Sequence, residues 1–193
     1  IQTSLVGSEM CIRDRNISDL ENNIVSNSTK KFPPVHLWNP ELCEGQEISI
    51  NREGEWFYNN SEIKNQRLIQ LFSSVLKRED DNYFLVTPSE KVPVKVEIAP
   101  YVIINFDLLD SEIIQLDTNL DYSFHLDKIN TSRLIEYNNT HIPLVHVRDS
   151  IEGFFNRSTY YKLIDFALAN KLIKEDALFV SSSNHDHLIG KIA

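Results

Sequence analysis

The sequence is poor in the residues that mark the common nucleotide-binding and metal-binding classes. Only five of its 193 residues are glycine and only two are cysteine. The glycines form no GxGxxG or GxxxxGK run, which excludes a phosphate loop, because such loops close round the anion with glycine backbone amides. Cys11 and Cys43 are too few for a disulfide framework, and no CxxC or Cys/His spacing surrounds them.

Long apolar runs and clusters of basic residues are also absent. No apolar stretch reaches the roughly 20 residues that span a bilayer, and the N-terminal stretch lacks the basic start and apolar middle of a signal peptide. We therefore expect no membrane span and a reducing, cytoplasmic location. The formal net charge is -9 with no block of like charge. Since nonspecific binding to phosphate backbones needs clustered Lys and Arg, we expect no nucleic-acid partner.

What is present divides into a tail and two folded parts. Residues 1–15 resemble a translated sequencing-adapter remnant and are set aside, and the whole of 1–31 is expected to be a tail with few apolar anchors. An N-terminal α+β domain is predicted over 32–90. A C-terminal, β-barrel-like domain with a helix is predicted over 91–193. A chain of this length buries roughly 70% of its unfolded surface, so it needs no metal or disulfide to fold.

The first domain shows the pattern of a hairpin followed by a helix and a strand. Short strands are predicted at Ile48–Ile50 and Trp56–Tyr58, on either side of a Glu-Gly turn. Ser61 is a candidate N-cap for a helix that runs to about Arg78. Apolar residues there fall at i, i+3, i+4, i+7 and i+8, which is one stripe of a helix. The acidic stretch Asp80–Asn82 ends the helix ahead of a buried strand.

Apolar residues alternate with polar ones through most of the second half. Seven short strands in a meander are predicted between residues 92 and 155, about ten residues apart, which is typical of a barrel or a strongly bent antiparallel sheet. A helix follows, with Ser158 as its cap. Leu178–Ser181 is the last predicted strand, and Asn184–Ala193 is expected to be a tail.

Both halves show the same order of hairpin, amphipathic helix, acidic turn and strand. A shift of 95 residues places Arg67–Leu71 over Lys162–Phe166 and Asp81–Leu85 over Asp176–Val180 without a gap. Any two helix–turn–strand units share apolar periodicity, so chance explains part of the match. We predict an internal duplication, with a binding site in the groove between the two similar units.

Motifs from about residue 32 to residue 182 resemble the bacterial family known as domain of unknown function 1285. They are Pro33–Pro40, Trp56–Tyr58, Tyr83–Lys91, Glu97–Pro100, Thr118–Asn119, Val145–Arg148, Ile151–Glu152 and Arg157–Tyr161. The resemblance implies a two-part fold with repeated hairpin–helix motifs and a C-terminal part superficially like a pleckstrin-homology domain. It implies no established activity, only a regulatory or signalling role through a ligand or partner. Asp149-Ser150 departs from the family's Gly-Gly turn, and the C-terminal tail departs from its Gly-rich end.

Polar residues within these motifs form the predicted ligand site. Arg148 and Arg157 offer a forked donor for a carboxylate or a phosphate. Alternatively, Glu152 pairs with one of these arginines and ties the hairpin to the helix. The candidate ligand-binding residues are Thr87, Glu90, Lys91, Asn119, His146, Arg148, Glu152 and Arg157, and the candidate groove wall is Trp38, Trp56 and Phe84.

The sequence offers no catalytic constellation. It has no GxSxG elbow, and Cys43 has only His36 as a nearby helper, so a buried or loop cysteine is the favoured interpretation. His185 and His187 are the one candidate for a metal pair, but a solvated tail is favoured over a metal site. We predict no catalytic residue and no cofactor.

These observations favour a non-enzymatic module that binds a small anionic ligand, a peptide or a protein between its two halves and serves regulation or signalling. One alternative is a hydrolase with an unrecognised carboxylate or metal site, which a tightly bound metal or activity on simple esters would favour. Another is a scaffold or assembly protein, which a stable oligomer would favour.

Overall fold

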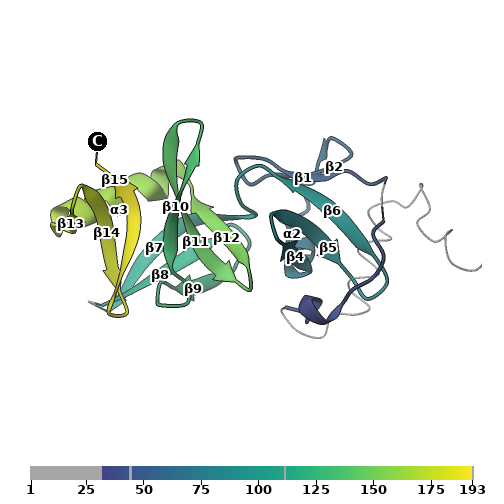
Figure 1. The fold of residues 1–193 in the computed structure, drawn as a ribbon, viewed down its shortest axis with the longest axis horizontal. Coiled ribbons are helices and arrows are strands. Elements are labelled where there is room, and N and C mark those ends of the chain that lie inside the picture. Colours follow the sequence, from purple (N-terminus) through teal and green to yellow (C-terminus); the bar gives the residue numbers. More distant parts are fainter. Residues whose placement is uncertain (1–31, 44, 111, 193) are drawn as a thin grey trace, which may run out of the picture. The chain divides into compact units, whose positions relative to one another are not determined.

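A computed structural model describes residues 32–43, 45–110 and 112–192, which form two compact units of α+β class, mostly β with two α-helices (Figure 1). Within the described residues the first unit holds 32–50 and Glu55–Val96, and the second holds Asn51–Gly54 and 97–192. The domain boundary predicted after residue 90 falls before a strand of the first unit's sheet. The predicted tail, 1–31, lies outside the described residues.

The first unit is built on a six-stranded sheet of order β3-β2-β1-β6-β5-β4. The elements are η1 (Val35–Leu37), β1 (Ile48–Ile50), β2 (Trp56–Tyr58), β3 (Ser61–Glu62), α2 (Gln66–Ser74), β4 (Leu76–Glu79), β5 (Asn82–Val86) and β6 (Lys91–Val96). β1 and β6 pair in parallel, and the other neighbours are antiparallel. A parallel pair needs a crossover connection, which the chain from β2 to β5 supplies.

The core of the first unit involves α2 and the sheet. Leu68, Ile69 and Phe72 are buried on the helix, and the Phe72 ring centroid lies 6.3 Å from that of Trp56. Trp56 and Phe72 are both fully buried. The alternating strand residues Ile48 and Ile50 are buried as well, as the period-two pattern of a half-buried strand requires.

The helix predicted from Ser61 to Arg78 is shorter at both ends. Ser61 belongs to β3. Asn65 caps α2, because its side-chain oxygen accepts hydrogen bonds from the backbone amides of Arg67 and Leu68. The helix ends at Ser74, and Leu76 pairs with Leu85 as the start of β4. Pairing with β5 therefore overrides the helical apolar stripe at its C-terminal end.

The second unit is built on a curled six-stranded sheet of order β10-β11-β12-β7-β8-β9 (Figure 1). Its strands are β7 (Tyr101–Asp110), β8 (Ile113–Thr118), β9 (Ser123–His125), β10 (Ser132–Tyr137), β11 (Thr140–Arg148) and β12 (Ile151–Phe155). The bent sheet is confirmed, but the simple antiparallel meander is wrong. β12 pairs in parallel with β7, with Gly153 opposite Tyr101.

A helix and a smaller sheet complete the second unit. α3 (Arg157–Ala169) is capped by Asn156, whose side chain accepts from the Thr159 amide at 2.7 Å, rather than by Ser158. β13 (Ile173–Lys174), β14 (Ala177–Ser182) and β15 (His185–Lys191) form a three-stranded antiparallel sheet. The predicted C-terminal tail is wrong, because Ser183 and Asn184 adopt positive φ and turn the chain back into β15.

The two segments matched by the 95-residue shift have similar local order. In each, a helix is followed by an antiparallel strand pair, β4–β5 after α2 and β13–β14 after α3. Each pair turns at acidic residues with positive φ, Asp80 in the first and Glu175 and Asp176 in the second. The duplication and the pleckstrin-homology likeness stay predictions. Neither α-helix of the described residues has the length and apolar character of a membrane crossing.

Candidate functional site

The predicted site residues divide between the two units. The first unit contains Trp38, Trp56, Phe84, Thr87, Glu90 and Lys91, and the second contains Asn119, His146, Arg148, Glu152 and Arg157. Trp56 is a core residue with no exposed surface, whereas Trp38 and Phe84 are half-buried.

Thr87 shapes the turn between β5 and β6. Its Oγ1 accepts from the amide of Glu90 at 3.1 Å and from that of Ser89 at 3.3 Å, while its own amide donates to the Glu90 carbonyl at 2.9 Å. Thr87 and Glu90 are both buried. The Thr87 hydroxyl therefore has a structural role as the organiser of this turn.

Lys91 takes part in a charged network on the first unit's sheet. Its Nζ lies 4.1 Å from the Phe84 ring centroid and pairs with the carboxylate of Glu79, which Lys77 reaches at 2.9 Å. Lys77 also donates to the Trp38 carbonyl at 3.2 Å, so the network fastens the proline-rich segment to β4. Hydrogen bonds from Lys91 and then Lys77 hold the pKa of Glu79 below its ordinary value.

In the second unit, Asn119 joins the end of β8 to β7. Its Oδ1 accepts from the Val102 amide at 3.0 Å, and its own amide donates to the Val102 carbonyl at 2.9 Å. Both backbone groups of Val102 are satisfied by this one residue. Asn119 thus continues the ladder beyond the last regular pair of the two strands.

A β-bulge in β11 separates two of the predicted site residues. His146 lies opposite Glu152 in the register with β12, whereas Arg148 lies opposite Ile151, with the bulge between them. Neighbouring residues of a strand point to opposite faces of a sheet. Because Glu152 and Ile151 are neighbours, His146 shares a face with Glu152, and Arg148 lies on the other face.

Glu152 forms a forked ion pair with Arg133 of β10. The Arg133 Nε donates to Oε1 at 2.5 Å and Nη2 donates to Oε2 at 2.7 Å. The predicted ion pair joined Glu152 to Arg148 or Arg157, but this one ties β10 to β12 across the intervening β11. Arg133 was missed because its closeness to Glu152 depends on the strand order, which the sequence pattern does not show.

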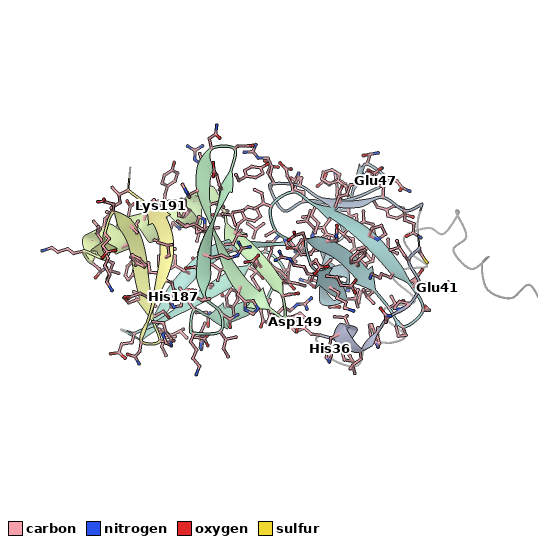
Figure 2. The ribbon with its side chains drawn as sticks, viewed as in Figure 1. His36, Glu41, Glu47, Asp149, His187 and Lys191 are labelled. Atoms are coloured by element: carbon pink, nitrogen blue, oxygen red, sulfur yellow. The ribbon has the colours of Figure 1, made fainter. Side chains whose placement is uncertain are left out.

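Arg148 is 8% exposed and lies at the end of the β11–β12 hairpin. Its Nε donates to the Tyr101 hydroxyl at 3.1 Å, and its Nη1 donates to Asp149 Oδ2 at 2.7 Å. Asp149, which is labelled in Figure 2, lies in the hairpin turn with a backbone φ of 49°. Its side chain is 60% exposed. An almost buried guanidinium therefore meets a carboxylate that stands in solvent.

Two tyrosines complete the surroundings of Arg148. Burial raises the pKa of Tyr122, and so does its neighbour Tyr101, while Arg148 acts in the opposite direction. Gly153 lets Tyr101 approach β12, since a Cβ there would lie 3.0 Å from both Cβ and the carbonyl oxygen of Tyr101. A glycine inside a strand can indicate such a close approach in the sequence. The sequence around the two tyrosines contains no pattern that would have predicted their place beside Arg148.

Arg157 does not join this cluster. It is the exposed first residue of α3, with its guanidinium carbon 5.6 Å from the Tyr161 ring centroid. Arg148 pairs with Ile151 at the start of β12, whereas Arg157 follows the end of that strand. The two positions are therefore separated by the length of β12, roughly 15 Å or more at about 3.3 Å per residue. The structure therefore does not bring the two arginines together as one forked donor.

The histidines differ in their surroundings. His146 Nε2 contacts the Asp149 carbonyl oxygen, while its Nδ1 is buried and has no hydrogen-bond partner among the described residues. His185 is exposed and His187 is 1% exposed, so the latter is not part of a solvated tail. Within 32–43, 45–110 and 112–192 no three His, Cys, Asp or Glu side chains are grouped to hold a metal ion.

The chain is similar to two consecutive family models and to two crystal structures. The model "Domain of unknown function (DUF1285), N-terminal domain" matches residues 33–99, and "Protein of unknown function (DUF1285), C-terminal domain" matches 95–189. No curated protein matches the chain.

Both crystal structures are of proteins from the same family. The structure of a DUF1285 family protein from Silicibacter pomeroyi DSS-3 is 30% identical, with a TM-score of 0.78, over 90% of this chain and 95% of that one. A DUF1285 family protein from Shewanella baltica OS155 is 28% identical, with a TM-score of 0.52, over 61% of this chain and 90% of that one.

Proposed function

Since the chain belongs to the DUF1285 family, we propose from the geometry of its second unit that it is a non-enzymatic regulatory module that binds a small anionic ligand. The ligand presents a carboxylate or phosphate group to Arg148. The observation that supports this most directly is the pairing of an almost buried guanidinium with the exposed carboxylate of Asp149.

Asp149 marks the position that a ligand oxyanion takes. Its contact with Arg148 Nη1 is a charge-assisted hydrogen bond of 2.7 Å, and such bonds are as favourable to an external carboxylate or phosphate as to an internal one. Because the Asp149 side chain is 60% exposed, its carboxylate can exchange this contact for water. A ligand oxyanion then takes the place of this oxygen at Arg148 Nη1.

The two tyrosines supply neutral donors beside the guanidinium. The Tyr101 hydroxyl accepts from Arg148 Nε and so keeps its own O–H as a donor, in a residue that is 1% exposed. Tyr122 has an ordinary pKa of 10.0 that burial raises further, so its hydroxyl is neutral at pH 7. A cation with two phenols recognises an oxyanion without supplying the nucleophile and base that catalysis needs.

A thermal-shift comparison of wild type and variants tests this proposal, with inorganic phosphate, citrate, nucleotides and an acidic peptide as probes. At least one probe is expected to raise the melting temperature of the wild type. Arg148→Lys keeps the charge but loses the fork, so it is expected to lose that shift. Arg157→Ala is the matched control, because it removes an exposed arginine and should leave the shift unchanged.

Asp149→Asn keeps the test decisive if Arg148→Lys folds poorly. Removing the internal competitor from an exposed turn is expected to leave the fold intact and to tighten probe binding by roughly three- to tenfold, about 1 kcal/mol. Unchanged binding in both Arg148→Lys and Asp149→Asn, or loss of binding in Arg157→Ala, would contradict the proposal.

A further inference from the structure

The C-terminal hairpin, defined as β14 and β15 (residues 177–191), is attached to the rest of the second unit by side-chain hydrogen bonds. Ser182 Oγ accepts from the Ile114 amide at 2.9 Å and donates to the Leu126 carbonyl at 2.5 Å. Ser132 Oγ donates to the Leu188 carbonyl at 2.6 Å. Among the described strands, β15 has a ladder only with β14. The hairpin is therefore held by these hydroxyls, by the Ser183 amide on the Glu112 carbonyl, by the Tyr160 hydroxyl on the Ile189 carbonyl, and by its buried apolar side chains.

His187 lies on β15 (Figure 2), between Ser182 and Leu188 in the sequence. It is next to Leu188 on β15 and opposite Val180 on β14, and it is 1% exposed. Neither of its ring nitrogens makes a hydrogen bond of ordinary geometry within the described residues, although the Ser182 backbone lies close enough to favour the charged ring. A buried polar ring without partners is unfavourable even when neutral, and a buried imidazolium, with two N–H donors, is far more so.

The charged groups that act on His187 lie on its own strand and in the loop after β9. On its own strand these are His185 and Asp186, and the Asp186 carboxylate pairs with Lys174 and accepts from Ser181 Oγ at 2.6 Å. From the loop after β9, Asp127 acts on it, but its Oδ1 accepts from two backbone amides, both at 2.7 Å.

The opposite strand offers no carboxylate to the ring, because β14 presents Val180 and the backbone of Ser182. Burial therefore outweighs the Ser182 backbone and the two nearby carboxylates, which all favour the charged ring, and holds the pKa of His187 below its ordinary value of 6.5.

We propose that His187 is a proton-operated latch for the C-terminal hairpin. With a neutral imidazole the hairpin docks through the serine hydroxyls. When the ring takes up a proton, the docked state loses stability relative to a state in which the hairpin has swung away and water solvates the imidazolium. Opening exposes Val180 and Ile189, which are fully buried in the docked state.

The direction of the pH effect follows from linkage. The pKa is lower in the docked state than in the open state, so opening takes up a proton. The opening equilibrium is constant above pH 6.5 and increases by up to about tenfold for each pH unit below it. The increase stops below the pKa of the docked state, where both states are protonated.

Hydrogen exchange read by mass spectrometry tests the latch at about pH 7.5 and about pH 5.5, with rates corrected for intrinsic exchange. In the wild type, protection of 177–191 is expected to fall by roughly tenfold at the lower pH, while β4–β6 of the first unit keeps its protection. His187→Asn, which does not titrate, is expected to abolish this fall. His185→Asn, an exposed change on the same strand, is the matched control and should behave as the wild type.

Three outcomes would overturn the latch. One is that protection of 177–191 depends on pH in His187→Asn as it does in the wild type. Another is that this pH dependence is lost in His185→Asn. The third is a stoichiometric metal ion in the purified protein that protects the hairpin, since His187 would then be a ligand. If His187→Asn does not fold, an NMR titration of wild-type His187 replaces it. A midpoint below 6.5 that coincides with hairpin opening supports the latch, and a midpoint of 6.5 without opening contradicts it.

Discussion

The segment made of α2 and β4–β6 and the segment made of α3 and β13–β15 share a local plan but differ in how they are anchored. In both, a helix is followed by three consecutive antiparallel strands. The first set of strands continues into a larger sheet, because β6 pairs with β1. The second set forms a sheet of its own and is held to the second unit by hydroxyl groups such as those of Ser182 and Ser132.

The two helices differ in burial as well. Phe72 of α2 is fully buried, with its ring beside that of Trp56, whereas Phe166 of α3 is half-buried, with its ring centroid 6.0 Å from that of Phe106. A ladder and a buried aromatic core make the first segment part of a cooperative unit. The second segment is joined to the rest of its unit at a seam, the contact lined by the Ser182 and Ser132 hydroxyls, and we expect it to be the one that opens locally.

The largest expected effect comes from truncating the two phenylalanines. Phe72→Ala should destabilise the first unit by about 3–5 kcal/mol, because it leaves a cavity beside Trp56. Phe166→Ala should destabilise the second by about 1–2 kcal/mol, since part of its ring is already solvated. Hydrogen exchange in urea, followed separately for each unit, measures both. Equal losses would remove the distinction between the two segments.

The next effect concerns the seam itself. Ser182→Ala removes the hydroxyl that pairs with both the Ile114 amide and the Leu126 carbonyl, and leaving two buried groups unpaired costs about 2–4 kcal/mol. Protection should fall in 177–191 first. Ser181→Ala is the control, because it loses an exposed bond to Asp186 and should change protection by less than about 0.5 kcal/mol. Similar losses in the two variants would show that the seam does not hold the hairpin.

The smallest expected effect on stability comes from two comparable carboxylates, one in each segment. Hydrogen bonds from lysines lower the pKa of Glu79 in the first segment and of Asp186 in the second. Each contributes stability at neutral pH that is lost as the pH falls below its ordinary value, 4.5 or 3.8. Both are partly exposed, so solvent screening keeps each contribution below about 1 kcal/mol.

Unit-resolved unfolding between about pH 6 and pH 3 measures these contributions. Glu79→Gln should flatten the acid dependence of the first unit alone, and Asp186→Asn that of the second alone. An effect of either variant on the other unit's acid dependence would contradict the assignment.

The same contrast explains how much of the fold could be predicted from the sequence. Helices, alternating strands and the bent sheet follow from local periodicity, and they were found. The end of α2 and the whole of β15 were not. Leu76 is a strand residue because it faces Leu85, and His187 because it faces Val180. The local sequence around a residue does not predict which residue of another strand lies opposite it.

The candidate site was predicted in the same partial way. Arg148 and Glu152 were found within motifs, but their partners Tyr101 and Arg133 lie 47 and 19 residues away in the sequence. These partners become neighbours only through the parallel β12–β7 pairing and the order of β10, β11 and β12. Sheet order is a property of the whole unit, so a scan for local motifs does not reveal it.

The side-chain NMR signal of Arg148 tests the proposed anion recognition most directly. The Nε–H resonance is assigned by its disappearance in Arg148→Lys and followed while inorganic phosphate or citrate is titrated into the wild type. We predict a saturable shift of this resonance, with no change at Arg157. An Arg148 signal that stays fixed while the probe binds, or that responds only in proportion to ionic strength, would contradict the account.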